Sequence, residues 1–143
     1  MNANGEKQQF DNPLDTTLSA SSRFAIEVVA WVAGPWAAAE ITGTWLAIFP
    51  TLIVLVALPG VFSTTGDKRH VVVAVPGKIR FLIEFILAVT AVYSAFLVWT
   101  PIGGGIVAVA AVVMLIAGLT RAKWLLSGRP PDWPLPSRPR ESK

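Results

Sequence analysis

Apolar residues fall into four long runs, separated by short polar stretches. The runs cover residues 24–42, 45–62, 81–99 and 102–119. A helix that crosses a bilayer needs about 20 mostly apolar residues, and each run is close to that length. The pattern therefore predicts an all-α fold, an integral membrane four-helix bundle in which each run is one span.

The first run is the least uniform of the four. It contains Glu27 near one end, Glu40 near the other, and the Gly34-Pro35 pair between them. Proline removes a backbone donor and clashes with the preceding turn, so a kink near Pro35 is predicted. Taken alone, this run also fits a re-entrant segment, which enters and leaves the membrane on the same side.

Two of the runs open with nearly the same five residues. The sequence RFAIE stands at residues 23–27, and RFLIE stands at residues 80–84. The same offset aligns two further pairs, Trp36 with Tyr93 and Ala38 with Ala95. Because the third run has the composition of a span, its counterpart, the first run, is expected to span too. The chain would then contain two helical hairpins in the same orientation, a parallel internal repeat.

Composition agrees with a membrane protein. Of the 143 residues, 53% are hydrophobic and 15% are charged, and the mean hydropathy is +0.57. A soluble domain carries about 25% charged residues, so this chain is poor in charge. It has no cysteine, which excludes disulfides and thiolate metal sites.

The basic residues indicate the orientation. All 12 Lys and Arg residues precede the first run, separate the second from the third, or follow the fourth. They are Lys7, Arg23, Lys68, Arg69, Lys78, Arg80, Arg121, Lys123, Arg129, Arg138, Arg140 and Lys143. Four spans place them all on one side, whereas three spans would divide them. By the positive-inside rule, both termini are predicted to be cytoplasmic.

The chain divides into three regions. Residues 1–22 form a polar cytoplasmic leader that lacks the basic start and apolar centre of a secretory signal, so no cleavage is expected. Residues 23–126 form the four-span membrane domain. Residues 127–143 form a Pro-rich, basic cytoplasmic tail, which is expected to be extended and to lie near anionic lipid.

The central loop carries an apolar stretch of its own. Within residues 63–78, the run VVVAV is too short to span and too rich in β-branched residues for a helix end. It is expected to be extended and to end in a turn at Pro76-Gly77. His70 is the only histidine, and without neighbouring ligands it is expected to be a solvated loop residue.

Each copy of the repeat places an arginine and a glutamate one helical turn apart. Arg23 can reach Glu27, and Arg80 can reach Glu84, because residues four apart share a helix face. Each arginine is expected to extend toward the lipid headgroups, with the carboxylate just beneath them. A buried carboxylate is costly unless it is paired, so both glutamates should face protein.

Small residues follow these glutamates along the same helix faces. Such residues let helix backbones approach closely within a membrane. The candidate packing stripe comprises Gly34, Ala38, Ala88, Ala91 and Ala95, together with the small-xxx-small pair Gly104 and Ala108 of the fourth run.

Two functions remain open at this point. In the first, the Arg/Glu pairs fix the helices in place, and the protein is a structural or interaction subunit. In the second, Glu27 and Glu84 bind protons or cations in a small proton-coupled transporter. The chain has no Gly-rich phosphate loop, no nucleophile with its base and no metal-ligand cluster, so no enzyme, cofactor or metal is predicted. The expected partners are anionic lipids at the cytoplasmic face and other membrane subunits or a second copy, with no nucleic acid.

The repeat also resembles a known family. The span-opening RFAIE, the loop ending VPGKIRFLIE, and the layout with all basic residues on one side are similar to the YrdB-like family of small bacterial membrane proteins. The resemblance covers roughly residues 23–126. It implies a four-span fold in a bacterial inner (plasma) membrane. The function of that family is unknown, so the resemblance implies no activity and no site residues.

Overall fold

The computed structural model describes residues 12–67 and 71–132, and within them it is mostly helical, as predicted. The elements in chain order are α1 (Thr17–Thr42), a 3-10 turn η1 (Trp45–Ala47), α2 (Ile48–Val61), β1 (Phe62–Ser63), β2 (Val73–Ala74), α3 (Gly77–Val98), α4 (Pro101–Ala117) and α5 (Leu119–Ser127). His70 and most of the predicted Pro-rich tail lie outside the described residues.

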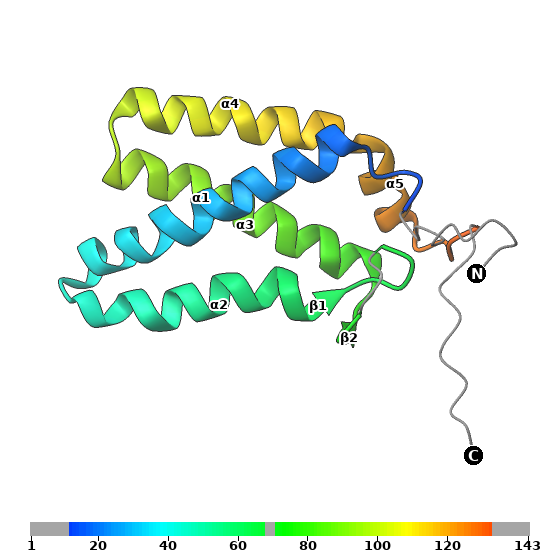
Figure 1. Cartoon of the computed structure of the whole chain (residues 1–143), viewed down its shortest axis with the longest axis horizontal. Coiled ribbons are helices and arrows are strands. Elements are labelled where there is room, and N and C mark those ends of the chain that lie inside the picture. Colours follow the sequence, from blue (N-terminus) through cyan, green and yellow to red (C-terminus); the bar gives the residue numbers. More distant parts are fainter. Residues whose placement is uncertain (1–11, 68–70, 133–143) are drawn as a thin grey trace, which may run out of the picture.

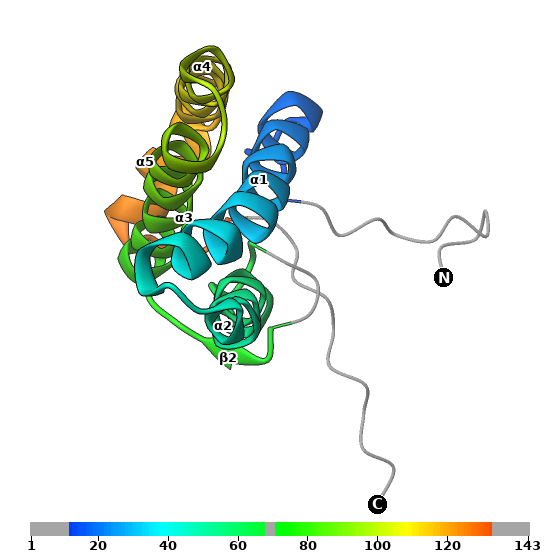
Figure 2. The same cartoon turned by 90° about the vertical axis from the view of Figure 1, so that its left-hand side faces the viewer.

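The four long helices lie side by side along one axis (Figure 1). α1 and α3 form the central pair, α4 packs against both on one side, and α2 packs against both on the other (Figure 2). α1 and α3 run in the same direction, so their N-termini lie at the same end of the bundle as α5 (Figure 1). The helices of the first and third runs are therefore parallel neighbours.

Small residues form much of the contact surface between the helices. Ala30, Ala91 and Ala95 have no exposed surface, and Ala88 is also buried. A Cβ added at Gly34 would lie 2.6 Å from Leu55 Cδ1, so the glycine allows α1 and α2 to approach closely. Side chains this small bring the backbones together and increase their van der Waals contact.

A hydrogen bond between helices compensates for a proline in α2. Pro59 has no N–H, so the carbonyl of Leu55, four residues earlier, has no intrahelical donor. The indole Nε1 of Trp31 in α1 donates to that carbonyl at 3.1 Å. The bond ties α1 to α2 at the point where the proline interrupts the α2 ladder.

Two helices begin earlier than the apolar runs predict. α1 begins at Thr17, inside the predicted polar leader, because the hydroxyl of Thr16 accepts the backbone N–H of Ser19 at 3.1 Å and caps the helix. α3 begins at Gly77 with Pro76 at its cap, so the predicted turn at these residues is instead a helix start. The two starts have different causes, because Thr16 caps α1 through its side chain, whereas Pro76 makes no side-chain cap hydrogen bond at the start of α3.

The end of the fourth run also differs from the prediction. α4 ends at Ala117, and after Gly118 the chain continues as α5, which is bent by 61° from α4. The sequence LTRAKWLLS of α5 mixes polar and apolar residues, so the pattern of apolar runs does not predict this helix.

The central loop is extended where VVVAV predicts it to be. Val73–Ala74 pairs in parallel with Phe62–Ser63, and Thr64 Oγ1 donates to the carbonyl of Val75 at 3.0 Å. These contacts close the loop on itself and place Asp67 inside the protein, with an exposed fraction of 8%.

The helices differ in their capacity to cross a membrane. α1 and α3 are long and apolar enough to do so, and a third span results if α4 and α5 together count as one bent span. The segment Trp45–Val61 is apolar but shorter.

Candidate functional site

Charged side chains from five segments meet at the end of the bundle where α1 and α3 begin, here called the network end. Three arginines and three carboxylates form the ion-pair network, which comprises Asp15, Arg23, Asp67, Arg80, Glu84 and Arg121. They come from the segment before α1, from α1, from the central loop, from α3 and from α5.

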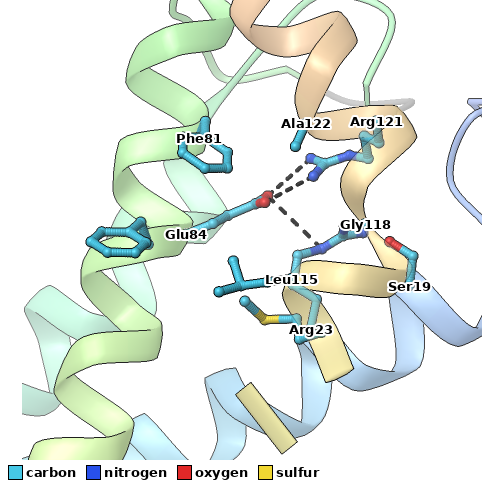
Figure 3. A pocket seen from close by; sticks show the side chains of 10 residues that line it. Ser19, Arg23, Phe81, Glu84, Leu115, Gly118, Arg121 and Ala122 are labelled. Carbon is cyan, nitrogen blue, oxygen red and sulfur yellow. Dashed lines mark hydrogen bonds and ion pairs between the residues drawn. The ribbon is translucent and has the colours of Figure 1, made fainter. Parts of the chain in front are cut away.

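Arg121 is the centre of the network. Its Nη1 and Nη2 donate to the two oxygens of Glu84 at 2.8 and 2.9 Å (Figure 3). Its Nε and Nη2 donate to the two oxygens of Asp67 at 2.6 and 2.5 Å. One guanidinium thus holds two carboxylates, each through two hydrogen bonds, which is the strongest geometry for such pairs. α5, the loop and α3 are joined by this single side chain.

Arg80 connects the network to α2. Its Nε lies 3.1 Å from Glu84 Oε1, four residues further along α3, and 3.7 Å from Asp67 Oδ2. Its Nη1 donates to the carbonyls of Pro59 and Phe62 at 3.1 and 2.9 Å. A cation at these carbonyls caps the C-terminus of α2 and interacts favourably with the helix dipole.

The expectation that Arg80 extends to the surface is wrong, because the residue has no exposed area. Within the protein, the carbonyls of Pro59 and Phe62 accept hydrogen bonds from its Nη1, and the carboxylates of Asp67 and Glu84 lie within ion-pair distance of its Nε.

Arg23 lies at the edge of the network. Its Nη2 is 2.5 Å from Asp15 Oδ2, and its Nε is 3.9 Å from Glu84 Oε1. It therefore contacts the glutamate of the other repeat copy. Glu27 is half-buried on α1, and its predicted pairing with Arg23 stays a prediction.

The carboxylate of Asp67, in the central loop, is stabilised in its charged form. Burial alone would raise the pKa of Asp67, but the hydrogen bonds and charge of Arg121, with the charges of Arg80 and Arg23, outweigh burial and hold that pKa below its ordinary value. Asn12 Nδ2 adds a hydrogen bond to Oδ1 at 3.3 Å. For Arg121, burial would lower the pKa, yet the bonds to Asp67 and Glu84 raise it. Both groups are therefore charged at neutral pH.

A small pocket opens beside Glu84 and Arg121 (Figure 3). Its volume is about 30 Å³, and its polar lining includes Ser19 and Arg23. This volume has room for one or two water molecules, whereas sites for small organic ligands span roughly 300–1,000 Å³.

The other predicted site residues lie along the helices. Gly34, Ala88, Ala91, Ala95 and Gly104 are buried, and Ala38 and Ala108 are half-buried. Glu40 is exposed at the opposite end of the bundle, where it accepts a hydrogen bond from the Trp36 indole at 3.2 Å.

Sequence reasoning missed half of the network. Asp67, Arg121 and Asp15 were not among the candidates. A signal for Asp67 was present, since it is the only acidic residue in the loop 63–78 and is surrounded there by basic ones. Nothing in the sequence showed that Arg121 lies on a helix bent back over α3.

No known protein family, curated protein or solved structure matches this chain, so the resemblance to the YrdB-like family stays a prediction.

Proposed function

We propose that this protein is a small multi-pass membrane protein that acts as a structural or interaction subunit in a bacterial inner membrane, with both termini in the cytoplasm. One observation carries the proposal. The ionisable groups of the network bind one another and thereby join five segments of the chain, so their charges are used to hold the bundle together.

The exposed surface supports a membrane setting. Each of the four long helices presents large apolar side chains that are more than half exposed, which soluble proteins avoid in contiguous patches. Examples are Phe24, Val32 and Ile41 on α1, Phe49, Ile53 and Val54 on α2, Leu82, Val89 and Tyr93 on α3, and Ile106, Val109 and Ile116 on α4.

The four-span arrangement is part of the proposal. The 17 residues of α4 extend about 25 Å at 1.5 Å per residue, close to the roughly 30 Å of hydrocarbon in a bilayer. The segment Trp45–Val61 has a similar length. Four spans keep the basic residues on one side, and membership of the YrdB-like family, suggested by RFAIE and VPGKIRFLIE, would agree.

The geometry around Glu84 favours the structural role over proton-coupled transport. A carrier glutamate must release its partners and take up a proton in each cycle. Glu84 accepts two hydrogen bonds from Arg121 and lies 3.1 Å from Arg80 Nε, so its release would break the ion pair that joins α3 to α5. The adjacent pocket holds water at most.

Substitution of Glu84 by glutamine tests the proposal. In Glu84→Gln, an amide NH₂, which is a donor, replaces one of the acceptor oxygens that face Arg121 and Arg80. The network also loses one negative charge, so three arginines remain with two carboxylates. A structural role predicts a loss of about 3–5 kcal/mol in the free energy of unfolding, as for other broken buried pairs. Thermal unfolding in a mild detergent measures it.

The matched control is Glu40→Gln, at an exposed glutamate of the opposite end, which should change stability by less than about 0.5 kcal/mol. Proton flux into vesicles containing each variant gives the second readout. A Glu84→Gln protein of normal stability that abolishes a flux seen with the unaltered protein would establish transport and refute the structural role.

A further inference from the structure

The nine residues of α5 divide into three faces. Arg121 and Leu125 are buried against the rest of the protein, and Trp124 between them is half-buried. A second row, Leu119, Ala122 and Leu126, is apolar, and its two leucines are 49% and 44% exposed. The third row is polar and exposed, and comprises Thr120, Lys123 and Ser127. At 3.6 residues per turn, each row occupies one side of the helix.

Two contacts fix the rotation of α5. Arg121 is bound to Asp67 and Glu84. On the same side, a Cβ added at Gly77 would overlap the backbone carbonyl of Leu125, so only a glycine at this position allows α5 to pack directly on the start of α3. The apolar row is therefore held in an exposed position, beginning three residues after Ile116, the last exposed residue of α4.

At the network end, the acidic and basic side chains differ in their exposure. Its three carboxylates lie inside, buried or half-buried, and are bound to arginines. Among the residues that the structure describes, the exposed charged side chains of the network end are Lys78, Lys123, Arg129 and Asp132. The outward-facing charge is thus mainly basic, next to an exposed apolar row.

From these features we infer that α5 lies in the membrane interface and binds anionic phospholipid. The 61° bend after α4 turns the helix away from the direction of the α4 helix. The row Leu119, Ala122 and Leu126 enters the boundary between headgroups and acyl chains, while Lys123 and Arg129 contact headgroup phosphates. The inference rests on the proposed membrane location and adds a lipid-binding element to it.

Spin labels on single cysteines test the position of the helix, because the chain has no native cysteine. The full chain is reconstituted in phosphatidylcholine vesicles, with and without phosphatidylglycerol. Leu126→Cys reports the apolar row, its neighbour Ser127→Cys reports the polar row, and Val109→Cys reports the exposed face of α4. The accessibility of each label to oxygen and to a water-soluble nickel complex is measured.

We expect the Leu126 and Val109 labels to favour oxygen and the Ser127 label to favour nickel. If both α5 labels favour nickel while the Val109 label favours oxygen, the membrane location would stand and the interfacial position of α5 would be refuted. An aqueous Val109 label would overturn the membrane location itself. A Leu126 label shielded from both reagents would mean that protein covers the apolar row, which also refutes the lipid assignment.

Charge reversal tests the headgroup contacts. Phosphatidylglycerol should shift the Leu126 label deeper, and the double change Lys123→Glu with Arg129→Glu should abolish this shift. Both residues are exposed and lie outside the network, so the Val109 label should stay unchanged. A depth of the Leu126 label that is the same with and without phosphatidylglycerol would refute binding of anionic lipid.

Discussion

Arg121 illustrates why this network needs arginine at its centre. A guanidinium presents five N–H donors in a fixed plane, and Arg121 uses all three of its nitrogen atoms to bind Asp67 and Glu84 from two sides. A lysine ammonium has three donors on one atom and could not hold two carboxylates in this way. The Arg121 side chain thus joins Asp67 of the central loop and Glu84 of α3 to α5.

The lowered pKa of Asp67 predicts an acid-sensitive contribution to stability. Because the pKa is lower in the folded protein than in the unfolded chain, the contribution is complete above the unfolded value of about 3.9 and is lost as the pH falls toward the folded value. Asp67→Asn should therefore be less stable than the unaltered protein at pH 7, and the difference should narrow below about pH 4. Unfolding of both proteins in detergent between pH 7 and pH 3 measures this, and a constant difference would contradict it.

At the scale of elements, proline placement makes one helix depend on another. α2 contains Pro59 two residues before its end, and Trp31 of α1 supplies the hydrogen bond that Leu55 loses. If residue 59 had a backbone N–H, that group could donate to the Leu55 carbonyl, and the hydrogen bond from Trp31 would contribute less to stability. The proline therefore turns an internal bond of α2 into a contact with α1.

A double-mutant cycle tests this dependence. Trp31→Phe keeps an aromatic ring but leaves the Leu55 carbonyl without its donor, so we expect a loss of about 1 kcal/mol in the free energy of unfolding. In a Pro59→Ala background, the backbone N–H at this position is restored, and the same change should cost clearly less. Thermal unfolding of the four proteins gives the coupling. An equal loss in both backgrounds would mean that Trp31 acts through packing alone.

At the scale of the whole molecule, the basic residues within 12–67 and 71–132 lie at the network end of the bundle. α1 and α3 begin there, the loop 63–78 closes there, and α5 covers it (Figure 1). The opposite end has only short connections, around Gly43 and Thr100, and its exposed charge is Glu40 within the part of the chain described. This asymmetry supports the proposed orientation with the network end in the cytoplasm.

Thiol labelling in intact cells tests that orientation. Thr65→Cys in the central loop and Thr100→Cys in the last connection are both exposed positions. An impermeant reagent should label Thr100→Cys and should reach Thr65→Cys only after the membrane is opened. Ser127→Cys, on the exposed side of α5, should behave like Thr65→Cys. Labelling of the two loops from the same side would refute the four-span arrangement.

The sequence by itself determined that there are four long helices, and it determined one of the ion pairs. Four apolar runs predict four helices because burial of an apolar segment favours the conformation that satisfies its backbone internally. Arg80 and Glu84 lie together because residues four apart on any helix share a face, whatever surrounds them. The stripe of Ala88, Ala91 and Ala95 follows from the same periodicity.

Only the tertiary structure decided the rest of the network. Arg121 is 37 residues from Glu84 and 54 from Asp67, and no local rule brings them together. Their contact needs the closed loop at β1 and β2, the bend after α4, and the absence of a Cβ at Gly77 beneath Leu125. Periodicity reports which residues share a face of one helix. Which carboxylate an arginine binds depends on how separate helices pack, and that packing depends on all of them at once.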